Sequence, residues 1–304
     1  MAMPTLLDIA KANGSDAVVG LIDETTKATP EVRLGAARTI KGISYKTLVR
    51  TGLPTVGFRL PNEGAAASHG VYENRTVETF TFNPRWECDK AVADRHEDGA
   101  QAFIAIEADG IMRAAMQWLA AQFYYGISND AKGFPGLLAA YDSTNMVIDA
   151  TGTTANTGSS VWGVCFGTQR VQWVWGQDGS LDLSELMTAR VTDGSSNPYT
   201  AYIQEMLAYP GLQVGDIRSI GRIKKLTADS GKGLTDSLLS QLLEKFPVGM
   251  KPDMWLMNRR SLGQLQRSRT ATSPSGAPAP VPEEAFGIPI QVTDAILSTE
   301  ALTL

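Results

Sequence analysis

Cysteine and histidine are scarce in this chain, which limits the chemistry that it can perform. Its 304 residues include two cysteines, Cys88 and Cys165, and two histidines, His69 and His96. Two thiols cannot form a disulfide framework, and nothing near either one has the spacing of metal ligands. We therefore expect both cysteines to be reduced and half-buried.

The chain also lacks the residue patterns of common active sites. His96, Glu97 and Asp98 are adjacent in a predicted helix, so they point in different directions and should form a solvated first turn rather than a metal site. The sequence around Lys232 contains DSGKG, but Gly233 stands where a phosphate-binding loop needs Ser or Thr. We predict no catalytic, cofactor or metal residues, although 32 acidic residues leave a carboxylate-based enzyme open as an alternative.

Long apolar runs and an excess of basic charge are absent as well. No stretch of about 18 apolar residues could span a membrane, and the first residues do not form a secretory signal, so we expect folding in a cytosol. The net charge of -5 argues against a dedicated nucleic-acid-binding protein.

The most informative stretch is residues 94–125, which predicts one long amphipathic helix. Acidic residues between 94 and 98 would favour its start, and Gly126 would end it. Asp109 and Arg113 are four residues apart and should form an ion pair. One face is apolar and comprises Ile104, Ala108, Ile111, Met112, Ala115, Leu119 and Phe123.

Before this helix, the sequence predicts a long β-hairpin. Residues 55–60 and 71–82 are rich in Val, Thr, Tyr and Phe, and the Gly-, Ala- and Ser-rich residues 61–70 would form its flexible tip. Neither face is apolar enough to be fully buried, and an isolated two-stranded ribbon is marginally stable in water. We expect the ribbon to pack on a partner subunit, with packing on the chain's own body as the alternative.

The remaining segments predict a mixed α+β protein. Two short helices are expected at 6–13 and 17–28, in a segment that would lie across this chain or a neighbour. Residues 161–166 and 171–176 predict a buried hairpin containing Trp162, Trp173 and Trp175. After a turn at 193–198, we expect a helix at 233–247 capped by Thr235, a strand at 254–258, a helix at 259–269, a loop at 270–287 and a terminal strand.

Taken in this order, the chain resembles the major capsid proteins of tailed bacteriophages, whose shell fold also occurs in herpesvirus capsids. Three features carry the resemblance: the hairpin directly before the long helix, the helix exit AAQFYYGISNDAKGFPGLLAAYD, and the ending MWLMNRRSLGQLQ followed by GIPIQVTDAIL. The resemblance implies a major-capsid-protein fold with a spine helix, an extended β-hairpin loop, and peripheral and axial domains. The implied ranges are an N-terminal arm at 1–50, the extended loop at 51–85, the start of the peripheral domain with the spine helix at 86–150, and the remaining peripheral strands and axial domain at 151–304.

The resemblance also implies function and partners. Identical subunits would form pentamers and hexamers that tile an icosahedral shell around double-stranded DNA, without sequence-specific DNA contacts, in a virion assembled in the host cytoplasm. Scaffolding, portal and decoration proteins would be further partners, and no membrane is involved. An encapsulin compartment around enzymes is the main alternative. On the extended loop, the expected assembly-interface residues are Phe58, Arg59, Glu63, His69, Tyr72, Glu73 and Arg75.

Overall fold

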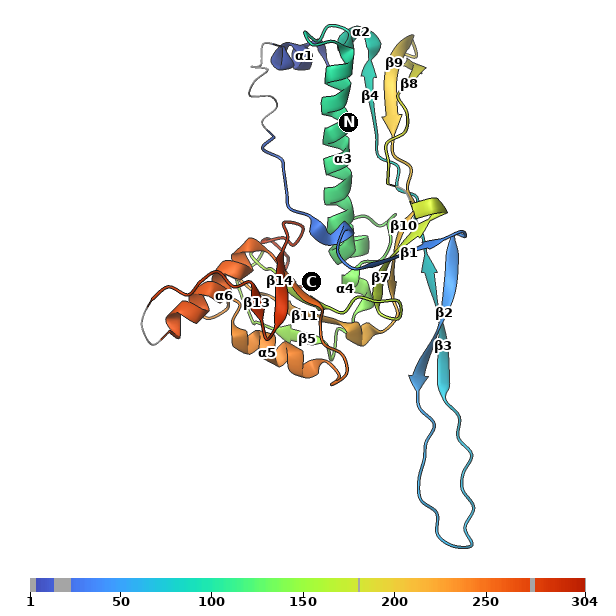
Figure 1. Cartoon of the computed structure of the whole chain (residues 1–304), viewed down its shortest axis with the longest axis vertical. Helices are drawn as coiled ribbons and strands as arrows, with labels where there is room; N and C mark the ends of the chain where they lie inside the picture. The colour runs from blue at the N-terminus through green and yellow to red at the C-terminus, as the bar shows by residue number, and fades with distance from the viewer. Residues whose placement is uncertain (1–3, 14–22, 180, 274–276, 304) are drawn as a thin grey trace.

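The computed structural model describes residues 4–13, 23–179, 181–273 and 277–303. Figure 1 shows an elongated molecule in which helix α3 (Ala100–Tyr125) extends from a mixed body in one direction and a two-stranded ribbon extends in the other. Helices and sheets both contribute to the body, which confirms the α+β class. No helix in the described part of the chain is long and apolar enough to cross a membrane.

The long helix begins later than the sequence predicted. Helix α2 (Lys90–Ala93) and a turn precede α3, and Gly99 adopts a φ of +84° directly before it. This left-handed conformation favours glycine and redirects the chain, so the acidic residues between 94 and 98 lie outside the first turn of α3. Their predicted role at the helix start is wrong. At the other end, Gly126 has a φ of +51° and ends the helix as predicted.

The cysteines and His96 are more buried than expected. Cys88 and Cys165 have no exposed surface, and burial raises the pKa of their thiols to about 11 and about 12, so both stay neutral and reduced. His96 is in the turn before α3 rather than in a helix; it is buried, and its Nδ1 accepts a 3.2 Å hydrogen bond from the Asp98 N–H. The prediction of a solvated first turn is therefore wrong for His96, whereas Glu97 and Asp98 are exposed as expected. No group of three His, Cys, Asp or Glu side chains among the described residues could hold a metal ion.

The predicted apolar face of α3 is correct at both ends of the helix and weaker in the middle. Ile104 packs in a small cluster with Ile9 and Trp86, whereas Leu119 and Phe123 belong to the main core. Ala108, Ile111 and Met112, in the middle, are only half-buried. The predicted ion pair forms, with 2.7 Å between Arg113 Nε and Asp109 Oδ2.

The N-terminal segment lies along α3 of the same chain. Helix α1 (Leu6–Ala12) buries Ile9, and the Asn13 amide donates to the Arg95 carbonyl at 3.1 Å. Further along, Asp23 pairs with Arg113 at 2.8 Å. Much of the second expected helix, at 17–28, lies outside the described residues, and the described remainder forms turns rather than helix.

The strands of the described residues form four sheets, one of which is the two-stranded ribbon. The six-stranded sheet, in spatial order, comprises β13 (Glu284–Ala285), β14 (Ile288–Val292), β12 (Met254–Met257), β6 (Val161–Val164), β11 (Ile220–Lys224) and β5 (Val147–Asp149). The first three-stranded sheet comprises β1 (Ala36–Ile40), β7 (Val171–Gly176) and β10 (Pro210–Val214). The second comprises β4 (Arg85–Asp89), β9 (Pro198–Glu205) and β8 (Met187–Thr192) and lies beside α3 in Figure 1.

The predicted hairpin of 161–166 and 171–176 is wrong in its pairing. Its strands, β6 and β7, belong to different sheets, although both are fully buried. The three tryptophans are core residues as predicted: Trp162, Trp173 and Trp175 all pack in the main cluster with the end of α3. The turn at 193–198 does join two paired strands, β8 and β9.

The C-terminal half forms a second core next to the first. Helix α5 (Asp236–Lys245) begins at the predicted cap, where Thr235 Oγ1 accepts a hydrogen bond from the Leu238 N–H at 3.3 Å. Helix α6 (Arg259–Ala271) comes directly after β12. It begins at the predicted residue and ends two residues after the predicted end, 269. Both helices pack with Trp255 in this second core. The short helix α4 (Leu137–Ala140) and the single-turn 3-10 helices at Pro30–Val32, Gly126–Ser128, Gln177–Gly179 and Ile217–Ser219 complete the regular structure of the described residues.

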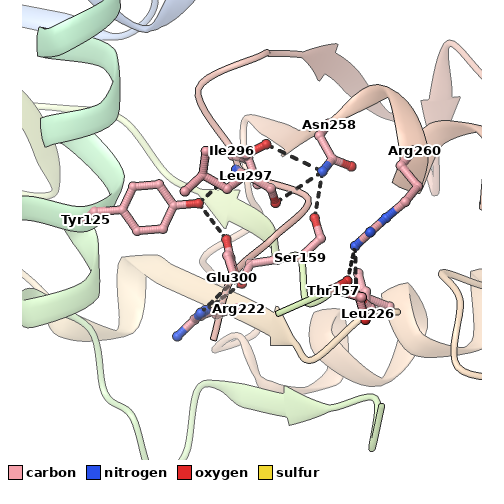
Figure 2. A network of polar contacts seen from close by, with 11 residues as sticks. Tyr125, Thr157, Ser159, Arg222, Leu226, Asn258, Arg260, Ile296, Leu297 and Glu300 are labelled. Atoms are coloured by element: carbon pink, nitrogen blue, oxygen red, sulfur yellow. Dashed lines mark hydrogen bonds and ion pairs between the residues drawn. The ribbon is translucent and has the colours of Figure 1, made fainter. Parts of the chain in front are cut away.

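A buried polar network joins the two cores near the C-terminus (Figure 2). Glu300 lies between Tyr125, at the end of α3, and Arg222, on β11. Nearby, the Asn258 amide donates to Ser159 Oγ at 2.7 Å and to backbone carbonyls of the C-terminal segment. The segment after β14 is therefore fixed to both cores.

Candidate assembly surface

The ribbon is the feature that projects farthest from the body (Figure 1). Its strands are β2 (Ser44–Gly52) and β3 (Val71–Glu78), paired antiparallel. The predicted first strand, at 55–60, is wrong, because this segment is part of an open loop at 53–70, which we call the tip. Alternating burial along β2 shows that Tyr45, Thr47 and Val49 face inward.

The ribbon and its tip expose large apolar side chains. Phe58 and Val56 have relative exposures of 110% and 89%. Large exposed apolar surfaces are rare on monomeric soluble proteins and mark sites of association. The exposed large apolar residues of this region are Ile43, Leu48, Leu53, Val56, Phe58, Leu60, Val71 and Tyr72.

Local polar contacts shape the tip in place of a core. The Thr55 N–H donates to Ser68 Oγ at 2.8 Å across the two sides of the loop. At the turn, Arg59 Nη1 donates to the Glu63 carbonyl at 2.7 Å. Hydrogen bonds exposed to solvent contribute little net stability. The tip can therefore adapt its conformation to a partner surface at low cost.

The structure divides the predicted interface residues into two groups. Phe58, Arg59, Glu63 and His69 are on the tip and Tyr72 and Glu73 on β3, and all six are exposed. Arg75 differs, because it is half-buried and its Nη1 donates to the Gly215 carbonyl of the body at 3.4 Å. Arg75 thus attaches the ribbon to its own chain rather than presenting a free surface.

Sequence reasoning missed the contribution of β2 to this surface. Leu48 and Leu53 are 69% and 77% exposed, and Arg50 lies over the Tyr72 ring, 5.3 Å from its centroid. The sequence did contain a sign of this strand: Tyr45, Thr47 and Val49 are each two residues apart, and residues two apart lie on the same face of a strand.

The base of the ribbon is held by backbone and polar side-chain contacts. The Phe80 N–H donates to the Pro210 carbonyl at 2.9 Å, which joins the end of the ribbon to β10. Gly211 allows this approach, since a Cβ there would lie 2.4 Å from the Glu78 carbonyl oxygen. Burial raises the pKa of the Tyr45 hydroxyl above its ordinary value, so Tyr45 remains a neutral donor at physiological pH.

The sequence as a whole matches a known family. The sequence profile described as major capsid protein GP7 matches residues 13–303. The chain belongs to this major capsid protein family. A major capsid protein is a structural component of the virion shell, so this subunit is a shell protein and not an enzyme.

A solved phage structure shares the fold. A chain in a cryo-EM structure of bacteriophage Epsilon15 superposes with a TM-score of 0.75 at 22% identity, covering 99% of this chain and 98% of that one. Mycobacterium phage Bobi (TM-score 0.46, 13% identity, 73% and 98% covered) and the SrpI encapsulin of Synechococcus elongatus PCC 7942 (TM-score 0.47, 9% identity, 76% and 98% covered) are more distant. Comparison with curated proteins finds no match. The Epsilon15 match confirms the phage-capsid fold.

Proposed function

We propose that this capsid subunit assembles with identical copies into pentamers and hexamers that close an icosahedral phage head around double-stranded DNA. In this proposal the ribbon and its tip form contacts between copies. The observation that carries the assignment is the row of exposed apolar side chains on a projecting ribbon, led by Phe58 at 110% exposure. Burying these side chains in an assembly would stabilise it by roughly 25 cal/mol per Å² of apolar surface removed from water.

Many such contacts acting together suit a closed shell. Each one is weak enough to dissociate when misplaced, while the assembled particle is held by all of them at once. A closed shell built from a single chain also requires similar contacts in slightly different geometries, which an adaptable tip supports.

The division into domains is part of this proposal. The N-terminal arm would end near residue 43 rather than residue 50, because β2 begins at Ser44 and belongs to the extended loop. Helix α3 would be the spine of the peripheral domain, and α5 and α6 would belong to the axial domain.

Partners and location complete the proposal. Assembly would take place in the host cytoplasm, with scaffolding, portal and decoration proteins as additional partners. The net charge of -5 favours a shell that does not hold the packaged DNA tightly, since tight binding to phosphates needs many cationic contacts.

Light scattering and negative-stain microscopy on the full chain, at rising concentration and with the neighbouring phage genes co-expressed, test the assignment. We expect closed shells or stable pentamers and hexamers, and DNA in particles produced during infection. Particles filled with a host enzyme instead of DNA would favour the encapsulin alternative. A chain that stays monomeric under all of these conditions would refute the proposal.

A further inference from the structure

Two buried glutamines face each other beneath the base of the ribbon. Gln172 on β7 and Gln213 on β10 are register partners, with exposures of 1% and 2%, and Gln172 Nε2 donates to Gln213 Oε1 at 2.7 Å. Burying an amide is unfavourable unless its hydrogen bonds are made. Apolar side chains would fill this position between paired strands at less cost, so the amides require another explanation.

The ribbon supplies a third member of this group. The Tyr45 hydroxyl, on β2, also donates to Gln213 Oε1, while Gln213 Nε2 donates to the Thr168 carbonyl at 2.8 Å. Gln213 Oε1 therefore has both of its donors, Gln172 and Tyr45, only when Tyr45 is in place. From the other side, the Arg38 guanidinium lies over the Tyr45 ring, 4.7 Å from its centroid.

Two further contacts hold the ribbon near Tyr45. Val77, the register partner of Tyr45, is buried, and Arg75 bonds to the Gly215 carbonyl at 3.4 Å. Beyond these positions towards the tip, the ribbon residues are mostly exposed. A rotation of the ribbon about its base that separates Tyr45 from Gln213 would also move Val77, whereas the residues nearer the tip would lose little burial.

We propose that Tyr45 is a positioning residue, whose hydrogen bond to the buried Gln172–Gln213 pair fixes the direction of the ribbon relative to the body. A rotated ribbon would remove one of the two donors that the Gln213 oxygen has in this structure, and the loss of this hydrogen bond favours the observed orientation. The backbone link to β10 alone would act as a hinge. Polar side chains at this position thus specify a direction, which apolar contacts, being non-directional, would do less well.

The direction of the ribbon has consequences for assembly, and this step rests on the proposed function. The tip lies far from the base of the ribbon, so a small rotation at the base becomes a large displacement at the tip (Figure 1). A shell closes only within a narrow range of angles between neighbouring subunits. When the rotation from one subunit to the next does not lead back to the first, the assembly stays open. Tyr45 would thereby select shells of uniform size.

The orientation can be measured on the unassembled full chain with two spin labels. Leu53→Cys, in the tip directly after β2, and Ser128→Cys, on the body, provide exposed labelling sites, while the native cysteines are fully buried. In this background we compare Tyr45→Phe with Tyr72→Phe. The second change is matched, because Tyr72 OH accepts a 3.1 Å hydrogen bond from Arg50 within the ribbon and does not contact the body.

We expect the background and Tyr72→Phe to give one narrow distance distribution, and Tyr45→Phe to give a broader one. The ratio of displaced to native ribbon should rise about fivefold, which corresponds to the net contribution of one hydrogen bond. Thermal melting would confirm that each variant is folded. An equally narrow distribution in Tyr45→Phe would overturn the inference.

Shells assembled from the same variants provide a second readout. Tyr45→Phe should yield mixed sizes and open sheets, whereas the parent chain should form shells of uniform size. Uniform shells from Tyr45→Phe would refute the link to assembly. If the parent itself never forms shells, the proposed function fails, yet the distance measurement still decides whether Tyr45 orients the ribbon.

Discussion

The hydroxyl of Tyr125, the last residue of α3, donates a 2.6 Å hydrogen bond to Oε1 of Glu300, 175 residues later in the chain. The other carboxylate oxygen of Glu300 accepts from Ser160 Oγ at 2.6 Å and pairs with Arg222 at 3.3 Å. Both charged side chains are almost completely buried, with exposures of 3% and 1%. One carboxylate therefore connects the long helix, the six-stranded sheet and the C-terminal segment.

We expect Glu300→Gln to destabilise the subunit strongly. The substitution keeps the shape of the side chain but leaves Arg222 as an uncompensated buried charge, which typically costs about 3–5 kcal/mol. Tyr125→Phe removes one hydrogen bond to a charged group and should cost about 1.5–3 kcal/mol. Urea unfolding of the unassembled subunit measures both. A loss below about 1 kcal/mol for Glu300→Gln would show that this network is not a junction between the cores.

Along α3, the stability lost when a side chain is truncated to alanine should depend on how buried that side chain is, and not on whether it belongs to the predicted apolar face. Leu119 is 1% exposed in the main core, so Leu119→Ala should reduce the free energy of unfolding by about 2–5 kcal/mol. Ile111 is half-buried, and Ile111→Ala should cost about half as much. Equal losses from the two variants, measured by the same urea titration, would contradict the observed packing.

The sequence predicted the C-terminal end of α3 correctly but not its N-terminal start. Gly126 adopts the positive φ that its residue type favours, so the end of the helix was predictable. The start was not, because Gly99 stops the helix from extending backwards through a segment whose acidic residues resemble a favourable first turn. A single glycine outweighed that charge pattern.

Pairings between distant segments were harder to predict. Trp162 and Trp173 were correctly assigned to the core from their strand-like surroundings, but periodicity could not show that β6 and β7 enter different sheets. The strand β2 was missed because it has exposed apolar residues on one face and Tyr45 on the other, whose partner Gln213 is 168 residues away. Of the predicted interface residues, only Arg75 proved to bond to the body, since a side chain's partner is a tertiary property.

The N-terminal segment should be held less strongly as pH rises. Glu31 is 1% exposed; burial raises the pKa of its carboxyl above the ordinary value of 4.5, and nearby Asp294 adds to the rise, although Tyr124 OH donates to it at 3.0 Å. The folded state thus prefers protonated Glu31. Its contribution to stability is fully present below pH 4.5 and is lost as pH rises through the raised pKa.

Glu31→Gln isolates this effect, because the amide remains neutral at every pH. We expect the difference in unfolding free energy, variant minus parent, to increase from pH 4.5 towards neutral pH and then to level off. Denaturant titrations at a series of pH values give this difference directly. A difference that is constant with pH would mean that Glu31 titrates normally.

Phe58 should matter to association and not to folding. Its side chain is 110% exposed, so Phe58→Ser should change the free energy of unfolding by less than about 0.5 kcal/mol. The same change should raise the protein concentration needed to form shells. Val248→Ser is a matched control, since Val248 is 109% exposed between α5 and β12, away from the ribbon. If the two changes affected assembly equally, Phe58 would not be part of the interface.

Deleting residues 61–70 tests the tip as a whole. The strands pair from Ser44 opposite Glu78 to Gly52 opposite Val71, so the deletion leaves every paired position in place and lets residues 53–60 close a shorter loop. The tip has no core of its own, and the subunit should melt at the temperature of the parent. Closed shells should nevertheless fail to form, because the remaining loop cannot reach as far. Normal shells from the deletion variant, seen by negative-stain microscopy, would show that residues 61–70 and the reach they give the tip are not needed for closure.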